Sequence, residues 1–237
     1  MRYRNIIHGF FKARPNRFTA YVTLEQTGET VKCHVKNTGR CKELLIPGAK
    51  VVLEDCRRGG SVRTTDYDLI AVYKGELLVN IDSQSPNEAA FEWVCGGLGT
   101  KGVKVINPRR EVKYGNSRFD IYYETFGNGR VVRHFLEVKG VTLEDNGIVR
   151  FPDAPTERGI KHIHELEAAK AEGYDAGILF VVQMERALYF EPNYITHPKF
   201  GEALYEASQK GIHITAMLCH VEEDEMWLTD KIPVKLQ

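Results

Sequence analysis

The sequence predicts a two-domain α/β (α+β) protein, with a small β-barrel over residues 1–82 and a mixed sheet flanked by helices over residues 83–237. Two observations predict it. The first part carries short runs rich in Val, Tyr, Thr and Leu that Gly and Pro interrupt. The second part alternates strand-like runs with helical periodicity. A polar break at residues 83–87 separates the two parts.

The barrel is predicted from strand-like segments at residues 18–25, 31–35, 50–54 and 66–81. Lys74 and Gly75 are expected to turn a hairpin inside the last segment. This number of strands fits a five-stranded OB-like barrel, and counting strands leaves an SH3-like barrel open.

The second domain is predicted to begin with a helix at residues 87–95, which Gly96 ends. Strands around residues 118–123 and 133–139 follow, and then a helix over residues 156–172 with Thr156 as its N-cap. The wholly apolar run 176–182 is typical of a central strand that is covered on both faces. A helix over residues 198–210, with Gly211 after it, and a strand over residues 212–218 complete the domain.

Composition indicates a soluble globular protein. The 237 residues are 43% hydrophobic and 27% charged, and no run approaches the ~18 apolar residues of a membrane span. The first residues lack the apolar core of a signal peptide. Five scattered cysteines without a C-x-x-C motif indicate reduced thiols. We therefore expect a cytoplasmic protein that is not associated with a membrane.

Charge is distributed unevenly although the net charge is zero. Residues 1–82 contain 14 Lys and Arg against 9 Asp and Glu, whereas residues 83–237 contain 18 against 23. The basic part suits phosphate binding, and the acidic part suits the use of a metal ion.

The most informative motif is Glu137-Val138-Lys139, at the end of a predicted strand. Side chains alternate along a strand, so Glu137 and Lys139 share a face. Asp120, on another predicted strand, supplies a second acid. Two carboxylates can bind Mg²⁺ or Mn²⁺, and a lysine can orient water or stabilise charge on a phosphate. This set is typical of a metal-dependent nuclease, whereas the triplet alone also fits a solvated strand edge.

Two acids near this motif need interpretation. Glu111 lies upstream of Asp120, where nucleases of the PD-(D/E)XK type often have an additional acid, and it also fits an ordinary surface position. Pro152-Asp153 spells the letters PD but follows Glu137. Asp120, with Phe119 in place of proline, is therefore the better match, and Asp153 is left as a ligand-binding residue or a helix start.

Basic side chains near the motif are candidate nucleic-acid contacts. Arg118 lies on the predicted Asp120 strand, and Arg158, Lys161 and His162 lie on one side of the predicted helix 156–172. The apolar stripe of that helix is predicted to be buried. The alternative is a solvated helix face.

The barrel supplies a second set of candidate contacts, in which cations are interleaved with aromatic residues. Phosphate-binding candidates are Arg14, Arg17, Asn37, Thr38 and Arg40, with Arg57, Arg58 and Arg63 forming a further basic loop. An Asn-Thr-Gly turn needs no ligand, and most of Phe10, Phe11 and Phe18 are expected to fill the barrel core.

Several long runs together resemble the sugar fermentation stimulation protein family of bacteria and archaea. They are residues 14–18, 37–39, 47–48, 111–120, 137–143, 151–162 and 178–183. The resemblance spans nearly the whole chain and departs at His197-Pro198, where Asp-Pro is expected. It implies an N-terminal OB-like barrel, a nuclease-like α/β domain of the PD-(D/E)XK type, DNA binding and a role in regulating sugar use.

The leading hypothesis is a DNA-binding protein with a metal-dependent nuclease site. Asp120 and Glu137 bind Mg²⁺ or Mn²⁺, with Glu111 as an additional acid, and Lys139 acts on the water or the phosphate. Nucleic acid is the expected partner, DNA rather than RNA. The alternative is a non-catalytic DNA-binding regulator of sugar-metabolism genes that retains the nuclease-like fold. A small-molecule enzyme has little support, because the chain has no P-loop, G-x-S-x-G or H-E-x-x-H motif.

Overall fold

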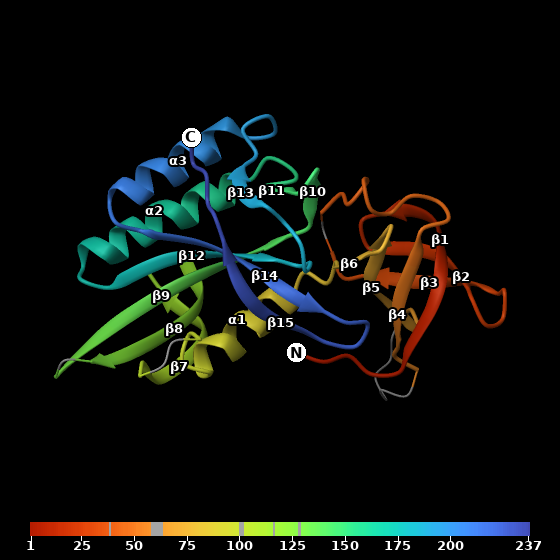
Figure 1. Cartoon of the computed structure of the whole chain (residues 1–237), viewed down its shortest axis with the longest axis horizontal. Helices are drawn as coiled ribbons and strands as arrows, with labels where there is room; N and C mark the ends of the chain where they lie inside the picture. The colour runs from red at the N-terminus through yellow and green to blue at the C-terminus, as the bar shows by residue number, and fades with distance from the viewer. Residues whose placement is uncertain (38, 58–63, 100–101, 116, 128) are drawn as a thin grey trace.

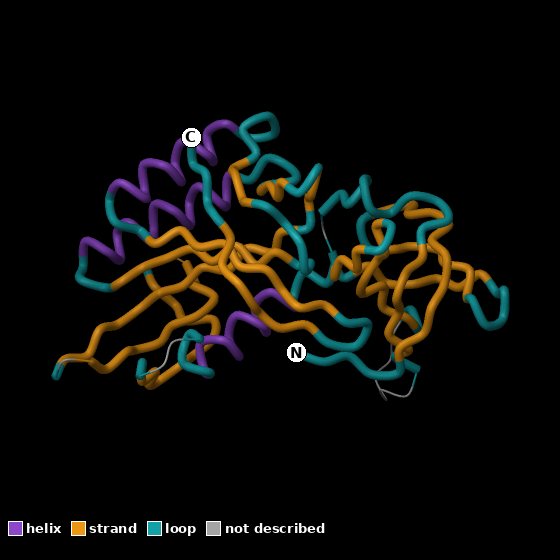
Figure 2. Tube along the Cα trace, viewed as in Figure 1, coloured by secondary structure: helices purple, strands orange, loops and turns teal. Residues whose placement is uncertain are grey.

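A computed structural model describes the chain from Met1 to Gln237 except residues 38, 58–63, 100–101, 116 and 128. Thr38, Arg58 and Arg63, three of the predicted phosphate contacts, lie outside the described residues. The described part forms two domains that lie side by side (Figure 1). Figure 2 shows that strands dominate the first domain, whereas the helices lie in the second.

The first domain is a closed five-stranded barrel with a sixth strand added. Its strands are β1 (Ile6–Asn16), β2 (Thr19–Leu24), β3 (Thr30–Val35), β4 (Lys50–Asp55), β5 (Tyr67–Lys74) and β6 (Leu77–Asn80). The order β3-β2-β1-β4-β5 is closed by a parallel pairing between β3 and β5, and β6 extends β5. The structure confirms the OB-like barrel and excludes the SH3-like alternative, which strand counting could not do.

The prediction for the barrel core is wrong at two positions. Phe11 is 4% exposed and packs inside the barrel, but Phe10 is 41% exposed and Phe18 is 55% exposed. Alternation along β1 explains the difference between Phe10 and Phe11, because consecutive side chains point to opposite faces of a strand. Phe18 lies in the turn between β1 and β2. The sequence analysis also placed no strand over β1, whose pairing with β2 is interrupted by irregularities after Phe11 and Ala13.

The second domain is built on a six-stranded mixed sheet in the order β15-β14-β12-β9-β8-β7. These strands are β7 (Lys104–Tyr114), β8 (Ser117–Gly127), β9 (Arg130–Val141), β12 (Asp175–Val182), β14 (His213–Val221) and β15 (Met226–Ile232). The three central strands β9, β12 and β14 run parallel, and the outer strands pair antiparallel. A small side sheet contains β10 (Leu143–Asp145), β11 (Ile148–Phe151) and β13 (Tyr189–Pro192).

Helices cover both faces of the large sheet (Figure 1). α2 (Glu157–Ala171) and α3 (Pro198–Gln209) pack together on one face, and α1 (Ser85–Cys95) lies on the other. The predicted N-cap of α2 is confirmed, because the Thr156 hydroxyl accepts the main-chain N–H of Gly159 at 3.0 Å. α1 begins two residues before the predicted start. No helix of the described residues is long and apolar enough to cross a membrane.

A buried polar cluster joins the two domains. Gln183, at the end of β12, donates from Nε2 toward Asn80 Oδ1 and the main-chain oxygen of Asp82, each at 3.0 Å. The Ser85 hydroxyl donates to Asn80 Oδ1 at 2.8 Å. Gln183, Asn80, Asp82 and Ser85 are each at most 1% exposed. Since buried polar groups are costly unless they are paired, this cluster holds the end of the barrel against the first helix and the central strand.

Candidate active site

The site forms where two neighbouring strands of the large sheet separate. β8 and β9 pair from Ile121 opposite Leu136 to Gly127 opposite Arg130. Asp120 lies one residue before this ladder begins, and its Oδ2 accepts the main-chain N–H of Val138 at 2.7 Å. If the β8–β9 ladder continued, a main-chain carbonyl of β8 would accept a hydrogen bond from β9. Here the Asp120 carboxylate accepts it instead, so an acidic side chain lies between the two strands.

Glu137 is 1% exposed and lies on β9, on the sheet face that α2 covers. Its Oε1 accepts hydrogen bonds from Lys139 Nζ, two residues along the strand, and from His162 Nδ1 on α2. Its Oε2 is buried and has no hydrogen-bond partner among the described residues. A buried carboxylate oxygen without a partner is costly, and a bound cation removes that cost.

The two carboxylates respond differently to burial. Burial, followed by the nearby Glu137 carboxylate, raises the pKa of Asp120 to about 6. Burial also raises the pKa of Glu137, but hydrogen bonds from His162 and Lys139 outweigh it and hold that pKa below its usual value. Glu137 is therefore ionised at neutral pH, and a cation between the groups would favour ionisation of Asp120 as well.

Asn87 is a site residue that the sequence analysis missed. It lies on the first turns of α1, and its Nδ2 donates to Asp120 Oδ1 at 3.0 Å. Asn87 and Asp120 are 33 residues apart, and the contact depends on how α1 packs beneath the sheet. No local pattern in the sequence marks it, because asparagine near the start of a helix is ordinary.

A depression of about 490 Å³ adjoins Asp120. Its lining includes most of the basic and acidic side chains predicted near the motif, together with two others: Glu111, Lys113, Ser117, Arg118, Asp120, Arg158, Lys161 and His162. Glu111 is exposed, and its carboxylate lies 3.5 Å from Arg118. Four Lys and Arg side chains against two acids make this depression suitable for a phosphate group.

His162 is more buried than Arg158 and Lys161, the other predicted nucleic-acid contacts on α2. It is 6% exposed, and both ring nitrogens have partners. Nδ1 contacts Glu137, and Nε2 accepts from Arg158 Nε at 3.2 Å. All three side chains line the depression, but the His162 ring is buried against Glu137, whereas Arg158 and Lys161 are exposed.

Three of the predicted contacts on the barrel, Arg14, Arg17 and Arg40, line a second depression of about 520 Å³. Its basic lining residues are Lys12, Arg14, Arg17, Arg40 and Lys42. Arg14 also stabilises the loops around this depression. Its terminal nitrogens donate to the main-chain oxygens of residues 17, 37, 39 and 40 at 2.7–2.9 Å. Asn37 is tied down as well, with Nδ2 donating to the carbonyl of Ile81 at 2.7 Å.

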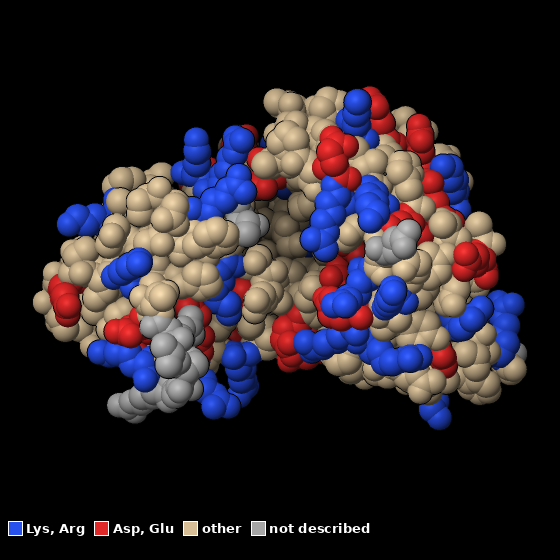
Figure 3. All heavy atoms as spheres, turned by 180° about the vertical axis from the view of Figure 1, so that it is seen from behind, with Lys and Arg blue, Asp and Glu red and all other residues tan. Residues whose placement is uncertain are grey.

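Figure 3 shows Lys and Arg side chains on both banks of a hollow between the domains. A small cavity of about 200 Å³ lies between them and is lined from the barrel by Asn37 and Gly39 and from the second domain by Gly140, Arg150 and Asp153, among others. Asp153 Oδ2 accepts the main-chain N–H of Arg40 at 2.9 Å. The N-cap of α2 is Thr156 and not Asp153. The Asp153 carboxylate instead links the two domains through its hydrogen bond with Arg40.

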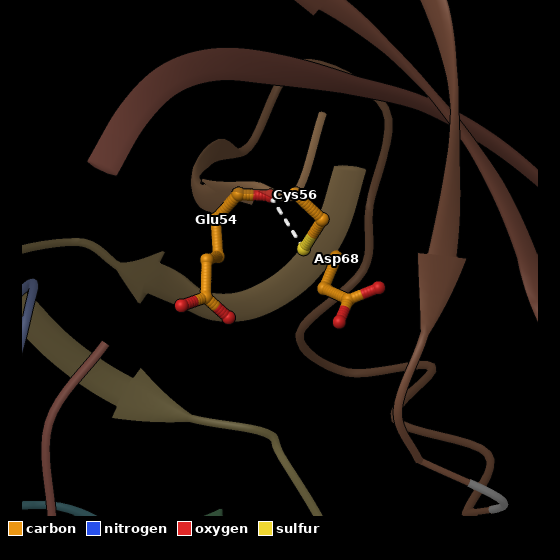
Figure 4. A group of neighbouring side chains, drawn as sticks. All are labelled: Glu54, Cys56 and Asp68. Carbon is orange, nitrogen blue, oxygen red and sulfur yellow. Dashed lines mark hydrogen bonds between the residues drawn. The ribbon is translucent and has the colours of Figure 1, made fainter. Parts of the chain in front are cut away.

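A second group of side chains that could bind a metal lies on the barrel. In the described part of the chain, Glu54, Cys56 and Asp68 place one ligand atom each within 4.8 Å of one another (Figure 4). They lie on the barrel strands β4 and β5 or just after β4, and Cys56 Sγ donates to the Glu54 carbonyl at 3.6 Å. Glu54 accepts the Arg4 main-chain N–H at 2.9 Å, and Asp68 lies 3.4 Å from His34. These groups have protein partners, whereas Glu137 Oε2 has none in the described part of the chain.

Comparison with known proteins gives consistent matches over the whole chain. The family model described as "Sugar fermentation stimulation protein RE domain" matches residues 84–225, and the model described as "SfsA N-terminal OB domain" matches residues 13–81. The sugar fermentation stimulation protein homolog of Clostridium beijerinckii is 50% identical over 236 residues, covering 100% of both chains.

Two further relatives extend this comparison. The homolog from Alkaliphilus oremlandii is 47% identical and covers 99% of this chain and 98% of its own. The solved structure of Pyrococcus furiosus SfsA in complex with Ca²⁺ superposes with a TM-score of 0.84 at 27% identity, covering 99% of this chain and 98% of that chain.

Proposed function

The chain belongs to the sugar fermentation stimulation protein family, and we propose that it is a metal-dependent phosphodiesterase that binds and cleaves nucleic acid, DNA rather than RNA. One observation carries the proposal. Asp120, Glu137 and Lys139 converge where β8 and β9 separate, and one buried oxygen of Glu137 has no partner among the residues that the structure describes. An acid pair with an adjacent lysine is the set that phosphodiester hydrolysis needs.

The donor set fits a hard divalent cation, Mg²⁺ or Mn²⁺. Asp120 and Glu137 would hold it through carboxylate oxygens, which such ions prefer. When bound, a cation of this kind lowers the pKa of a coordinated water and neutralises charge on a phosphate. The Ca²⁺ in the Pyrococcus furiosus relative supports a divalent-cation site in this family.

The chain's own residues supply the remaining functions. Lys139, whose side chain is 16% exposed, can turn its ammonium group from Glu137 toward a phosphate oxygen or the attacking water. Asn87 and the Val138 N–H hold the Asp120 carboxylate in one orientation. Lys113, Arg118, Arg158 and Lys161 neutralise the backbone of a strand that enters the adjoining depression.

Nucleic acid is supported as the substrate by the basic lining of both domains. The barrel depression contributes Arg17, Arg40 and Lys42, and Figure 3 shows basic side chains on both banks of the hollow. Contacts of this kind bind the phosphate backbone and carry little sequence information. The predicted contact of Glu111 with the metal remains a proposal, as does a phosphate contact by Arg14.

The test is incubation of wild-type protein, Glu137→Gln and Asp120→Ala with labelled single- and double-stranded DNA and RNA, in Mg²⁺, Mn²⁺ or EDTA. We expect cleavage by wild type only, and only with metal, because both variants lose a metal ligand. Glu202→Gln, a change of an exposed acid on α3, is the matched control and should cleave like wild type.

Binding by gel shift in the same samples separates the two hypotheses. Asp120→Ala should retain nucleic-acid binding, since the basic side chains are unchanged. Binding by wild type without cleavage in any metal would contradict the nuclease proposal. That result would favour the alternative, a non-catalytic DNA-binding regulator of sugar-metabolism genes.

A further inference from the structure

We infer that His162 is a positioning residue for the metal site, which holds Glu137 so that Oε2 is left for the cation. This inference rests on the proposed function, because it concerns the same carboxylate. It assigns His162 a task other than contacting nucleic acid. Three observations carry it: burial, the pairing of both ring nitrogens and the unequal partners of the two Glu137 oxygens.

The first step concerns location. His162 lies on α2, on the side that packs against the sheet, and is 6% exposed. Its ring lines the depression beside Asp120 but offers little exposed surface to a nucleic-acid strand. Arg158, one helical turn earlier, lies on the same face of the helix and lines the depression beside Asp120.

The second step concerns which ring nitrogen carries the proton. Arginine can only donate, so the Arg158 Nε contact at 3.2 Å requires a lone pair on His162 Nε2. The proton of the neutral ring then lies on Nδ1, which points at Glu137 Oε1. Arg158 and the Glu137 carboxylate thus both favour the tautomer in which His162 donates to the carboxylate.

The third step concerns the carboxylate. Oε1 of Glu137 receives both the His162 and the Lys139 hydrogen bonds, whereas Oε2 receives none from the described residues. Two donors on one oxygen fix the plane of the carboxylate and direct the other oxygen away from protein donors. Histidine contacts of this kind behind a metal ligand change metal affinity by about 10- to 100-fold when they are removed.

The experiment compares two amides that differ in where the nitrogen lies. His162→Asn places an N–H near the position of Nδ1, whereas His162→Gln places it near Nε2. Titration calorimetry with Ca²⁺ and with Mn²⁺ should show that His162→Gln raises Kd by roughly 10- to 100-fold and His162→Asn by much less. His164→Asn is the matched control on the same helix, with a 58% exposed side chain, and should bind like wild type.

A second measurement needs no metal. Nitrogen-15 NMR of the histidine rings in the metal-free protein should show His162 as the Nδ1–H tautomer, because the Glu137 carboxylate can only accept. Urea unfolding of each variant shows whether a loss of metal binding reflects a loss of fold. Agreement of the Asn and Gln variants with each other in Kd, or an Nε2–H tautomer in wild type, would overturn the inference.

The outcomes also distinguish this inference from the proposed function. If wild-type protein binds neither cation, the proposed metal site itself is wrong. If wild type binds and His162→Gln binds equally well, the metal site stands and the positioning role of His162 is wrong.

Discussion

At the scale of single residues, identical side chains have different tasks. Arg14 and Arg17 are three positions apart and both line the barrel depression. The guanidinium of Arg14 donates to four main-chain oxygens of the surrounding loops, whereas Arg17 is exposed. The sequence motif treats them alike, but the structure gives Arg14 a stabilising role and leaves the Arg17 side chain exposed to solvent.

Substitution of these two arginines should separate stability from binding. Arg14→Ala should lower the free energy of unfolding by about 3 kcal/mol, because it removes charge-assisted hydrogen bonds to several carbonyls at once. Arg17→Ala should leave stability within about 0.5 kcal/mol and weaken nucleic-acid binding. Urea unfolding and gel shifts at one salt concentration measure both. Equal loss of stability in the two variants would contradict this division.

At the scale of elements, the separation of β8 from β9 creates the site. The ladder ends at Ile121 and Leu136, so Asp120 can reach the Val138 N–H. α2 then covers Glu137 from one face and supplies His162, while α1 supplies Asn87 from the other. The start of α2 therefore affects the site, because Thr156 fixes the first turn that carries Arg158.

The cap of α2 gives a prediction at this scale. Thr156→Ala removes the acceptor for the Gly159 N–H and should destabilise the protein by about 1 kcal/mol, while Thr156→Ser should keep the bond and most of the stability. The metal Kd of the alanine variant should rise as the first turn frays. Thermal unfolding and calorimetry check both effects. A serine variant as unstable as the alanine variant would show that the lost methyl contacts, rather than the cap, matter.

At the scale of the whole molecule, the buried cluster around Gln183 couples the barrel to the second domain. Gln183 Nε2 reaches acceptors on the end of β6 and on the segment that leads to α1. Gly140, next to Lys139, packs closely against the Gln183 side chain. A Cβ atom added at Gly140 would lie only 2.5 Å from Gln183 Oε1. The position of the barrel and the strand that carries the lysine are thus fixed by one group of contacts.

Removal of the Gln183 amide should lower the stability of the protein, because this amide bonds groups of both domains. Gln183→Leu leaves the buried oxygens of Asn80 and Asp82 without this donor and should cost about 1–3 kcal/mol of unfolding free energy. Gln209→Leu, on the exposed end of α3, is the matched control and should change stability little. Urea unfolding monitored by tryptophan fluorescence measures the difference. Equal stability of the two variants would show that the cluster does not hold the domains together.

The sequence by itself determined the two-domain order, the barrel, the helix that Thr156 caps and the strand that carries Glu137 and Lys139. These features depend on local signals, namely apolar periodicity, capping residues and alternation along a strand. The same alternation did not reveal that Phe10 is exposed, because the sequence analysis did not place β1. Phe18 is exposed because it lies in the turn before β2 and not on the predicted strand.

Only the tertiary structure decided how the site is assembled. Asp120 meets Asn87 across 33 residues and the Val138 N–H across 18, and Glu137 meets His162 across 25. Loops and helices from elsewhere in the chain decide whether Arg14 faces carbonyls or solvent. They also decide which oxygen of Glu137 accepts the hydrogen bonds from Lys139 and His162. Such contacts between distant residues leave no periodic pattern in the sequence, so the motif gives the chemistry but not its geometry.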